Sequence, residues 1–170
     1  MAMASSPEEL EHDYVIGAVR LLDTSAVRLF HVTTEAPASK LDDELAGMMP
    51  RLEAAKAAAG IAAAGPVVVR YFETADPGIY RMDVGVPVAE GIAPAAGARV
   101  EMLPGFHCAA VLYWGSVGHV SDAYNALGQA IAACGLVRAP EGREWYLHFE
   151  GDASPHNVIL LQLEVAPDEP

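Results

Sequence analysis

The sequence predicts an α+β fold in which the order β-β-α-β-β occurs twice, with the helices on one face of an antiparallel sheet. Two segments with the 3.6-residue rhythm of an amphipathic helix are each flanked by pairs of strand-like runs. In addition, residues 65–88 align with residues 142–165 without a gap, which places Phe72 on Phe149 and Glu73 on Glu150. The matching order of elements supports an internal repeat.

The first copy begins with two β-branched-rich runs between Tyr14 and Thr33, which we expect to form a hairpin around a short polar turn. A helix follows within residues 36–60, with Ser39 as a candidate N-cap and Gly60 as its stop. Pro50 lies inside this helix and should kink it or start a second one. The copy closes with two strands joined by the turn TADPG.

The second copy repeats this order. Two strand-like runs surround the pair Pro104-Gly105, and an amphipathic helix then ends at Gly135. The runs REWYLHFE and NVILLQLEV supply the last two strands.

We therefore expect one domain over residues 13–166, with the first half at 13–88, an Ala/Gly/Pro-rich linker at 89–98 and the second half at 99–166. Residues 1–12 are polar and acidic, and we expect a disordered lead-in there and no signal peptide. Cys108 and Cys134 lie in apolar runs without metal-like spacing, which predicts two buried, reduced thiols in a cytoplasmic protein.

The net charge of the chain indicates which kinds of molecule are disfavoured as partners. Ten basic and twenty-three acidic residues give a net charge of −13, which disfavours direct contact with nucleic acid or anionic membranes. Apolar runs of membrane-spanning length are absent from the sequence. The acidic surface would attract cations, although it would equally serve solubility alone.

Alternation along the strands suggests where a ligand groove lies. Tyr71 and Glu73 share one strand face, as do Tyr146, His148 and Glu150, while Phe72 and Phe149 point to the opposite face, where we expect the helices to pack. If the halves pack about a pseudo-twofold axis, the two Tyr/Glu faces would line one groove between them, suited to flat lipophilic cations. A solvated sheet face would carry the same residue types, so Glu73 and Glu150 could also face water.

Other side chains are weaker candidates. Of Tyr113 and Trp114, one should enter the core and the other the groove, and alternation does not decide which. The six histidines have no zinc-binding spacing, and the sequence has no phosphate loop, nucleophile elbow or dinucleotide fingerprint. We therefore expect neither a metal nor a cofactor.

Motifs along the chain resemble those of the GyrI-like small-molecule-binding family, which also supplies the effector-binding domain of multidrug-sensing regulators of the MerR and AraC types. The resemblance covers about residues 13–166. It is carried by GPVVVRYFETADPGIYRMDVGVPV, by VEMLPGFHCAAVLYWGSVGHVSDAYNALGQAIAACGL and by the Glu-x-Tyr-Leu element in REWYLHFE.

The resemblance implies the duplicated architecture and an aromatic-lined pocket between the halves. It also implies a buried glutamate in the last strand of drug sensors, and our alignment places that position at Leu160. Gln162, Glu164 or Glu150 could substitute for it. The residues expected to bind a ligand are therefore Tyr71, Tyr113, Trp114, Tyr146, His148, Glu150, Leu160 and Gln162.

Three functions follow as hypotheses. The first is a stand-alone domain that senses or sequesters a hydrophobic, aromatic and possibly cationic small molecule. The second, implied by other GyrI-like proteins, is a hydrolase of strained, reactive rings in which Glu150 activates water with help from Tyr146 or His148. The third is an acidic module that binds a protein partner, as in gyrase-directed relatives, and a homodimer is also possible.

Overall fold

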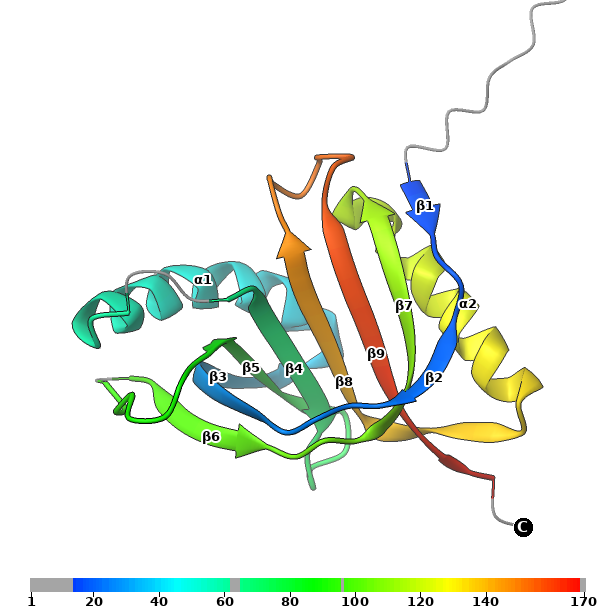
Figure 1. The fold of residues 1–170 in the computed structure, drawn as a ribbon, viewed down its shortest axis with the longest axis horizontal. Coiled ribbons are helices and arrows are strands. Elements are labelled where there is room, and N and C mark those ends of the chain that lie inside the picture. Colours follow the sequence, from blue (N-terminus) through cyan, green and yellow to red (C-terminus); the bar gives the residue numbers. More distant parts are fainter. Residues whose placement is uncertain (1–13, 62–64, 96, 169–170) are drawn as a thin grey trace, which may run out of the picture.

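Nine strands and two helices make up an α+β fold in the computed structural model, which describes residues 14–61, 65–95 and 97–168 (Figure 1). The expected lead-in at 1–12 lies outside these residues. In chain order the elements are β1 (Tyr14–Ile16), β2 (Arg20–Asp23), β3 (Val27–Pro37), α1 (Leu41–Ala58), β4 (Val67–Glu73), β5 (Ile79–Pro87), β6 (Arg99–Leu103), β7 (His107–Gly115), α2 (Val120–Ala133), β8 (Leu136–His148) and β9 (Val158–Pro167).

All strands join one antiparallel sheet in the order β1-β7-β9-β8-β4-β5-β3-β6. β2 also pairs with β7, along residues 107–110, whereas β1 pairs with residues 113–115. The predicted pairs β4–β5 and β8–β9 are present. At the middle of the sheet β4 pairs with β8, from Val67 opposite Tyr146 to Tyr71 opposite Gly142. This ladder joins the N-terminal strands β3–β5 to the C-terminal strands β7–β9.

The hairpin expected at Tyr14–Thr33 is wrong. β2 pairs with β7, whereas β3 pairs with β5 and β6. The strands around Pro104-Gly105 likewise separate, because β6 borders β3 and β7 borders β9. β2 therefore completes the sheet beside β7, and β6 completes it beside β3. Short turn signals do not encode such long-range pairings.

The segments that follow β2 and β6 contact each other at Thr24 and Phe106. The Thr24 amide donates to the Phe106 carbonyl at 3.0 Å, and the Phe106 amide donates to Thr24 Oγ1 at 3.0 Å. A Cβ at Gly105 would lie 2.0 Å from the Thr24 carbonyl oxygen. Only glycine allows the two backbones to approach this closely.

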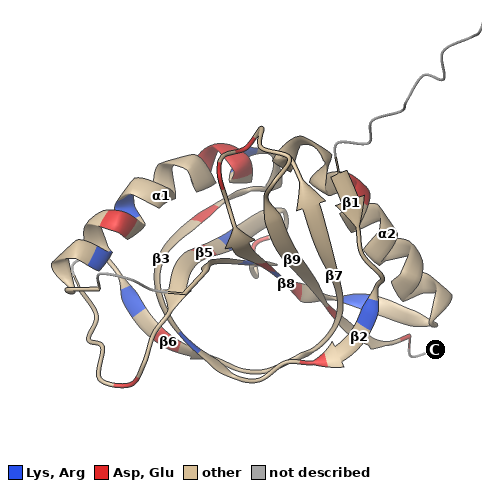
Figure 2. Ribbon diagram, turned by 45° about the horizontal axis from the view of Figure 1, so that its top comes forward, with Lys and Arg blue, Asp and Glu red and all other residues tan. Residues whose placement is uncertain are grey.

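Both helices cover the outer face of the curved sheet (Figure 2). α1 continues through Pro50, against the expected break, and Ser39 does not cap it, since Lys40 holds the N-cap position without a side-chain bond. The predicted helix stops hold, because Gly60 and Gly135 adopt positive φ values of 72° and 66° just beyond the helices.

The helix-packed face is the opposite of the expected one. Met48 and Leu52 of α1 pack against Val69 and its neighbours, and α2 packs against β7 and β9. Phe72 lies on the other face against the guanidinium groups of Arg70 and Arg81. Phe149 follows the end of β8 and is 47% exposed. An irregularity between Tyr146 and His148 breaks the alternation on which its assignment rested.

Cysteine burial is confirmed for one thiol only. Cys108 is buried in β7, but Cys134, one residue beyond α2, is exposed, so the expectation of two buried thiols was wrong for it. Among the described residues, neither helix is long and apolar enough to cross a membrane.

The close crossing of the connectors gives a stability test. We expect Gly105→Ala to lower the free energy of unfolding by about 1–3 kcal/mol, because the added methyl group meets backbone that cannot move alone. Gly47→Ala is the matched control, since a Cβ there has no atom within 4 Å and alanine favours the helix. Urea unfolding of both variants measures the difference, and an equal or higher stability of Gly105→Ala would contradict the crossing.

Candidate functional site

A carboxylate and three tyrosines meet at the middle of the sheet, beside α2. Tyr146 donates a hydrogen bond to Glu144 Oε2 at 2.7 Å, and Tyr124 of α2 donates to Glu144 Oε1. Tyr71 of β4 donates to the Tyr124 hydroxyl at 2.8 Å. We call these residues the Glu144 cluster: Tyr71, Tyr124, Glu144 and Tyr146.

The β4–β8 ladder assembles this cluster. Alternation puts Glu144 and Tyr146 on the helix-packed face of β8, and Tyr71 on the same face of β4. Tyr71 lies opposite Gly142, where a Cβ would come within 2.4 Å of the tyrosine Cζ. The glycine therefore lets the Tyr71 ring lie across β8 and reach Tyr124.

Burial controls the protonation of the cluster. Desolvation raises the pKa of Glu144, and the hydrogen bonds from Tyr124 and Tyr146 oppose this only in part. Asp42, at the start of α1, raises the pKa of Glu144 further through its negative charge. Burial also raises the pKa of Tyr71 to about 12 and that of Tyr124 well above its usual value, so both phenols stay protonated donors at neutral pH.

A hollow of about 400 Å³ adjoins the cluster. It runs between α2 and the start of β8, with Tyr124 at its wall. Its lining is Tyr124, Asn125, Gly128, Ile131, Ala132, Leu136, Val137, Arg138 and Leu163. Glu144 is half-buried and does not line the hollow, so Tyr124 is the residue that the hollow and the cluster share.

The structure brings together two of the eight expected ligand-binding residues, Tyr71 and Tyr146. Tyr113 is fully buried in the core under α2, where its hydroxyl donates to the Ser116 carbonyl. Trp114, Leu160 and Gln162 belong to the opposite face of the sheet, where Gln162 accepts a hydrogen bond from Trp145. These residues do not line the Glu144 cluster.

The expected catalytic candidate Glu150 is also displaced. It follows β8, is exposed, and pairs with His148 at 3.0 Å and with His156 at 3.1 Å. The hydrogen bond from His148, together with those from Ser154 and His156, lowers the pKa of Glu150 to about 2. Such a carboxylate is a weak base, and His148 and Glu150 pair with each other away from the Glu144 cluster.

Sequence reasoning missed Glu144 and Tyr124. Glu144 is the glutamate of the Glu-x-Tyr-Leu element, two residues before Tyr146, so alternation alone placed it on the face of Tyr146. Leu160, the position that our alignment matched to a glutamate of drug sensors, pairs with Trp145 on the other face of the sheet, away from the Glu144 cluster. Tyr124 carries no separate signal, since its spacing also suits a core residue.

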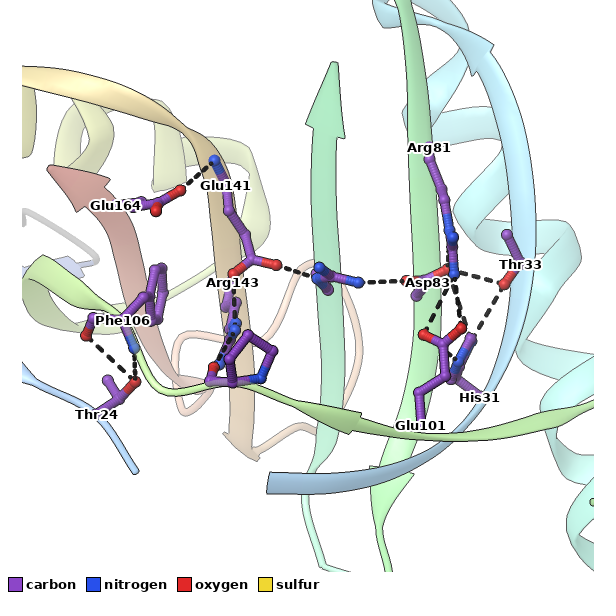
Figure 3. Close-up of polar contacts among 12 residues, drawn as sticks. Thr24, His31, Thr33, Arg81, Asp83, Glu101, Phe106, Glu141, Arg143 and Glu164 are labelled. Carbon is purple, nitrogen blue, oxygen red and sulfur yellow. Dashed lines mark hydrogen bonds and ion pairs between the residues drawn. The ribbon is translucent and has the colours of Figure 1, made fainter. Parts of the chain in front are cut away.

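The opposite face of the sheet holds a second polar cluster (Figure 3). Asp83 is fully buried and accepts hydrogen bonds from Thr33 at 2.8 Å, Arg81 at 3.0 Å and Arg70 at 3.3 Å. Arg70 also pairs with Glu141, which binds Arg143 at 2.7 Å. Arg143 in turn donates to the Pro104 carbonyl at 2.9 Å and stacks on Phe106, so this network supports the crossing connectors.

Part of this network has the composition of a metal site. Within the described residues, His31, Asp83 and Glu101 could each offer one ligand atom, and these atoms lie within 4.8 Å of one another. Two guanidinium groups already occupy the oxygens of Asp83, and Arg81 also reaches Glu101 at 3.4 Å. Their positive charge opposes a bound cation, and we interpret the group as ion pairing.

Comparison with known proteins supports the fold assignment. Neither the known family models nor the curated proteins contain a match to this chain. Among solved structures, the EcmrR C-terminal domain is similar at 12% identity and a TM-score of 0.66, covering 89% of this chain and 98% of that one. In the EcmrR–DNA complex the match covers only 58% of the EcmrR chain.

Two further solved structures share the fold. SAV2435 bound to tetraphenylphosphonium is 14% identical with a TM-score of 0.67, over 88% of this chain and 94% of that one. A hydrolase from Listeria innocua is 12% identical with a TM-score of 0.58, over 86% and 92%. The chain has the fold of GyrI-like effector-binding domains of MerR-type regulators, which confirms the resemblance found in the sequence.

The raised pKa of Glu144 predicts a pH dependence of stability. A carboxyl group with a higher pKa when folded stabilises the protein below its unfolded-state pKa, and this contribution is lost as pH rises through the folded-state pKa. We therefore expect the wild-type protein to lose stability relative to Glu144→Gln as pH rises across that window. Urea unfolding of both proteins at a series of pH values measures it. A difference that is constant, or that grows in the opposite direction, would refute the assignment.

Proposed function

We propose that this chain is a ligand-binding domain that captures hydrophobic, aromatic small molecules, preferably cations, at the Glu144 cluster. One observation carries the proposal: among the described residues, the desolvated Glu144 carboxylate has two tyrosine hydroxyls and no cationic side chain as its hydrogen-bond partners, and one of these tyrosines lines a hollow. The domain would serve in sensing or sequestering a drug or metabolite.

Electrostatics favour a cationic ligand. An ionised Glu144 is poorly solvated, so a positive charge that approaches it recovers stabilisation that water would otherwise provide. Asp42 and Asp152 add negative potential near the cluster, since both raise the pKa of Tyr146. The tyrosine faces offer cation–π contacts. The tyrosine hydroxyls now bonded to Glu144 are the groups that such a ligand would replace.

The similarity of fold to a solved structure supports the proposal of a cationic ligand. SAV2435, which shares the fold, is bound to tetraphenylphosphonium, a hydrophobic cation. The strand order also supports the internal repeat, because β7-β9-β8 on one side of the sheet mirrors β3-β5-β4 on the other. We infer that the groove belongs to the junction of two repeated halves, divided by a linker at 89–98.

The net charge of −13 leads us to propose that this domain does not contact nucleic acid directly and acts within the cytoplasm. A protein partner or a homodimer would then carry the signal of ligand binding.

Titration with tetraphenylphosphonium tests the proposal. We expect micromolar binding by calorimetry, and an affinity about 10- to 100-fold lower for Glu144→Gln, since a charge-assisted contact contributes about 1.5–3 kcal/mol. Binding should also weaken as pH falls through the raised pKa of Glu144, because protonation removes the negative charge.

Glu150→Gln is the matched control, because Glu150 is exposed and pairs with histidines away from the cluster. Its affinity should equal that of the wild type. Equal affinity of Glu144→Gln and the wild type, or no binding by the wild type, would overturn the proposal.

A second function, hydrolysis of a strained electrophilic ring, is favoured by the raised pKa of Glu144. A carboxylate of raised basicity can take a proton from water as the water oxygen attacks a ring carbon, while protonated Tyr146 can supply a proton to the departing oxygen. The hydrolase from Listeria innocua shares this fold. Glu144 replaces Glu150 as the residue for this role.

Styrene oxide is a suitable probe for this second function. We expect diol formation above the rate in buffer, reduced at least about 100-fold in Glu144→Gln and unchanged in Glu150→Gln, as measured by chromatography. A wild-type rate no higher than that in buffer, or an undiminished rate in Glu144→Gln, would leave ligand binding as the better description.

A further inference from the structure

Arg138 occupies a position that the Glu144 cluster alone does not explain. It lies on β8 opposite Val165, on the helix-packed face. It lines the hollow beside α2 and also a second hollow of about 540 Å³, whose lining is Glu73, Thr74, Tyr80, Arg138, Ala139 and Pro140. Arg138 is therefore the residue common to the two hollows.

The sheet opens at this point. Pairing between β4 and β8 stops at Tyr71 and Gly142, and β8 is irregular between Arg138 and Gly142. Residues 139–141 therefore leave the regular ladder, and the second hollow lies between this segment and the ends of β4 and β5. The two hollows share Arg138, and the first hollow shares Tyr124 with the Glu144 cluster.

Two hydrogen bonds connect Tyr71 to the carboxylate, since Tyr71 donates to Tyr124 and Tyr124 donates to Glu144. Burial raises the pKa of Tyr71, and the nearby positive charge of Arg138 opposes this rise. A positive charge thus lies near one end of this pair of tyrosines, and a carboxylate lies at the other end.

Arg138 differs from the arginines of the second polar cluster. Arg70, Arg81 and Arg143 each pair with a carboxylate on the opposite face of the sheet. Arg138 makes no ion pair with any described residue, although acidic residues outnumber basic ones by twenty-three to ten. Arg138 is exposed and lines both hollows, so its guanidinium is open to a ligand, and we interpret it as a binding residue.

We propose that the groove takes a dipolar ligand, whose cationic aromatic part lies at Glu144 and whose carboxylate or similar anionic group binds Arg138. This inference rests on the proposed function and specifies its ligand class. A planar guanidinium binds a carboxylate through two parallel hydrogen bonds, which fixes the orientation of the ligand in the groove.

A pair of dyes tests the orientation. The ethyl ester of a rhodamine is a lipophilic aromatic cation, and the free acid of the same dye is a zwitterion with an added carboxylate. We expect Arg138→Gln to weaken binding of the free acid about tenfold and to leave that of the ester unchanged. Glu144→Gln should weaken both dyes. Fluorescence anisotropy measures all affinities.

Controls separate this inference from the proposed function. Arg99→Gln removes an exposed arginine from β6, away from both hollows, and should affect neither dye. If the ester binds through Glu144 while Arg138→Gln affects both dyes equally or neither, the dipolar inference is wrong and the proposed function stands. If neither dye binds the wild-type protein, both are wrong. Equal thermal unfolding of Arg138→Gln and the wild type checks that the exposed substitution leaves the fold intact.

Discussion

The pairing of β4 with β8 is the constraint on which the rest of the structure depends. Five residue pairs join the N-terminal and C-terminal strands along the sheet, and the same pairs set Tyr71 over Gly142. Because side chains alternate, this register also decides that Glu144 and Tyr146 face the helices. A shift by one residue would turn the carboxylate to the other face, among the arginines, and the cluster would not exist.

The carboxylates on the two faces of the sheet have different hydrogen-bond partners. On the inner face, Asp83 and Glu141 are compensated by guanidinium groups, which neutralise them and tie the strands together. On the outer face, Glu144 is held by neutral hydroxyls, which cost little to replace compared with an ion pair. Guanidinium groups neutralise the inner-face carboxylates, whereas the partners of Glu144 leave its charge uncompensated.

The fold could be predicted from the sequence further than the site could. The helices, the β4–β5 and β8–β9 pairs and the fold family followed from periodicity and motifs, because these are local signals. The exchange of β2 and β6 was missed, since pairing across 80 or so residues leaves no local trace. At the site, an irregularity after Tyr146 places His148 and Glu150 outside the cluster, which regular alternation does not predict. Glu144 belongs to the Glu-x-Tyr-Leu element, but it was not identified from the sequence as a site residue. Tyr71 was found, but its partner Tyr124 depends on how α2 packs.

The crossed connectors have a consequence for how the chain can fold at all. The edge of β3 is covered by β6, and the edge of β7 is covered by β1 and β2, so each edge depends on strands from the distant part of the sequence. Because these strands belong to one polypeptide, each edge meets its covering strand at an effective concentration set by the intervening chain and independent of the protein concentration.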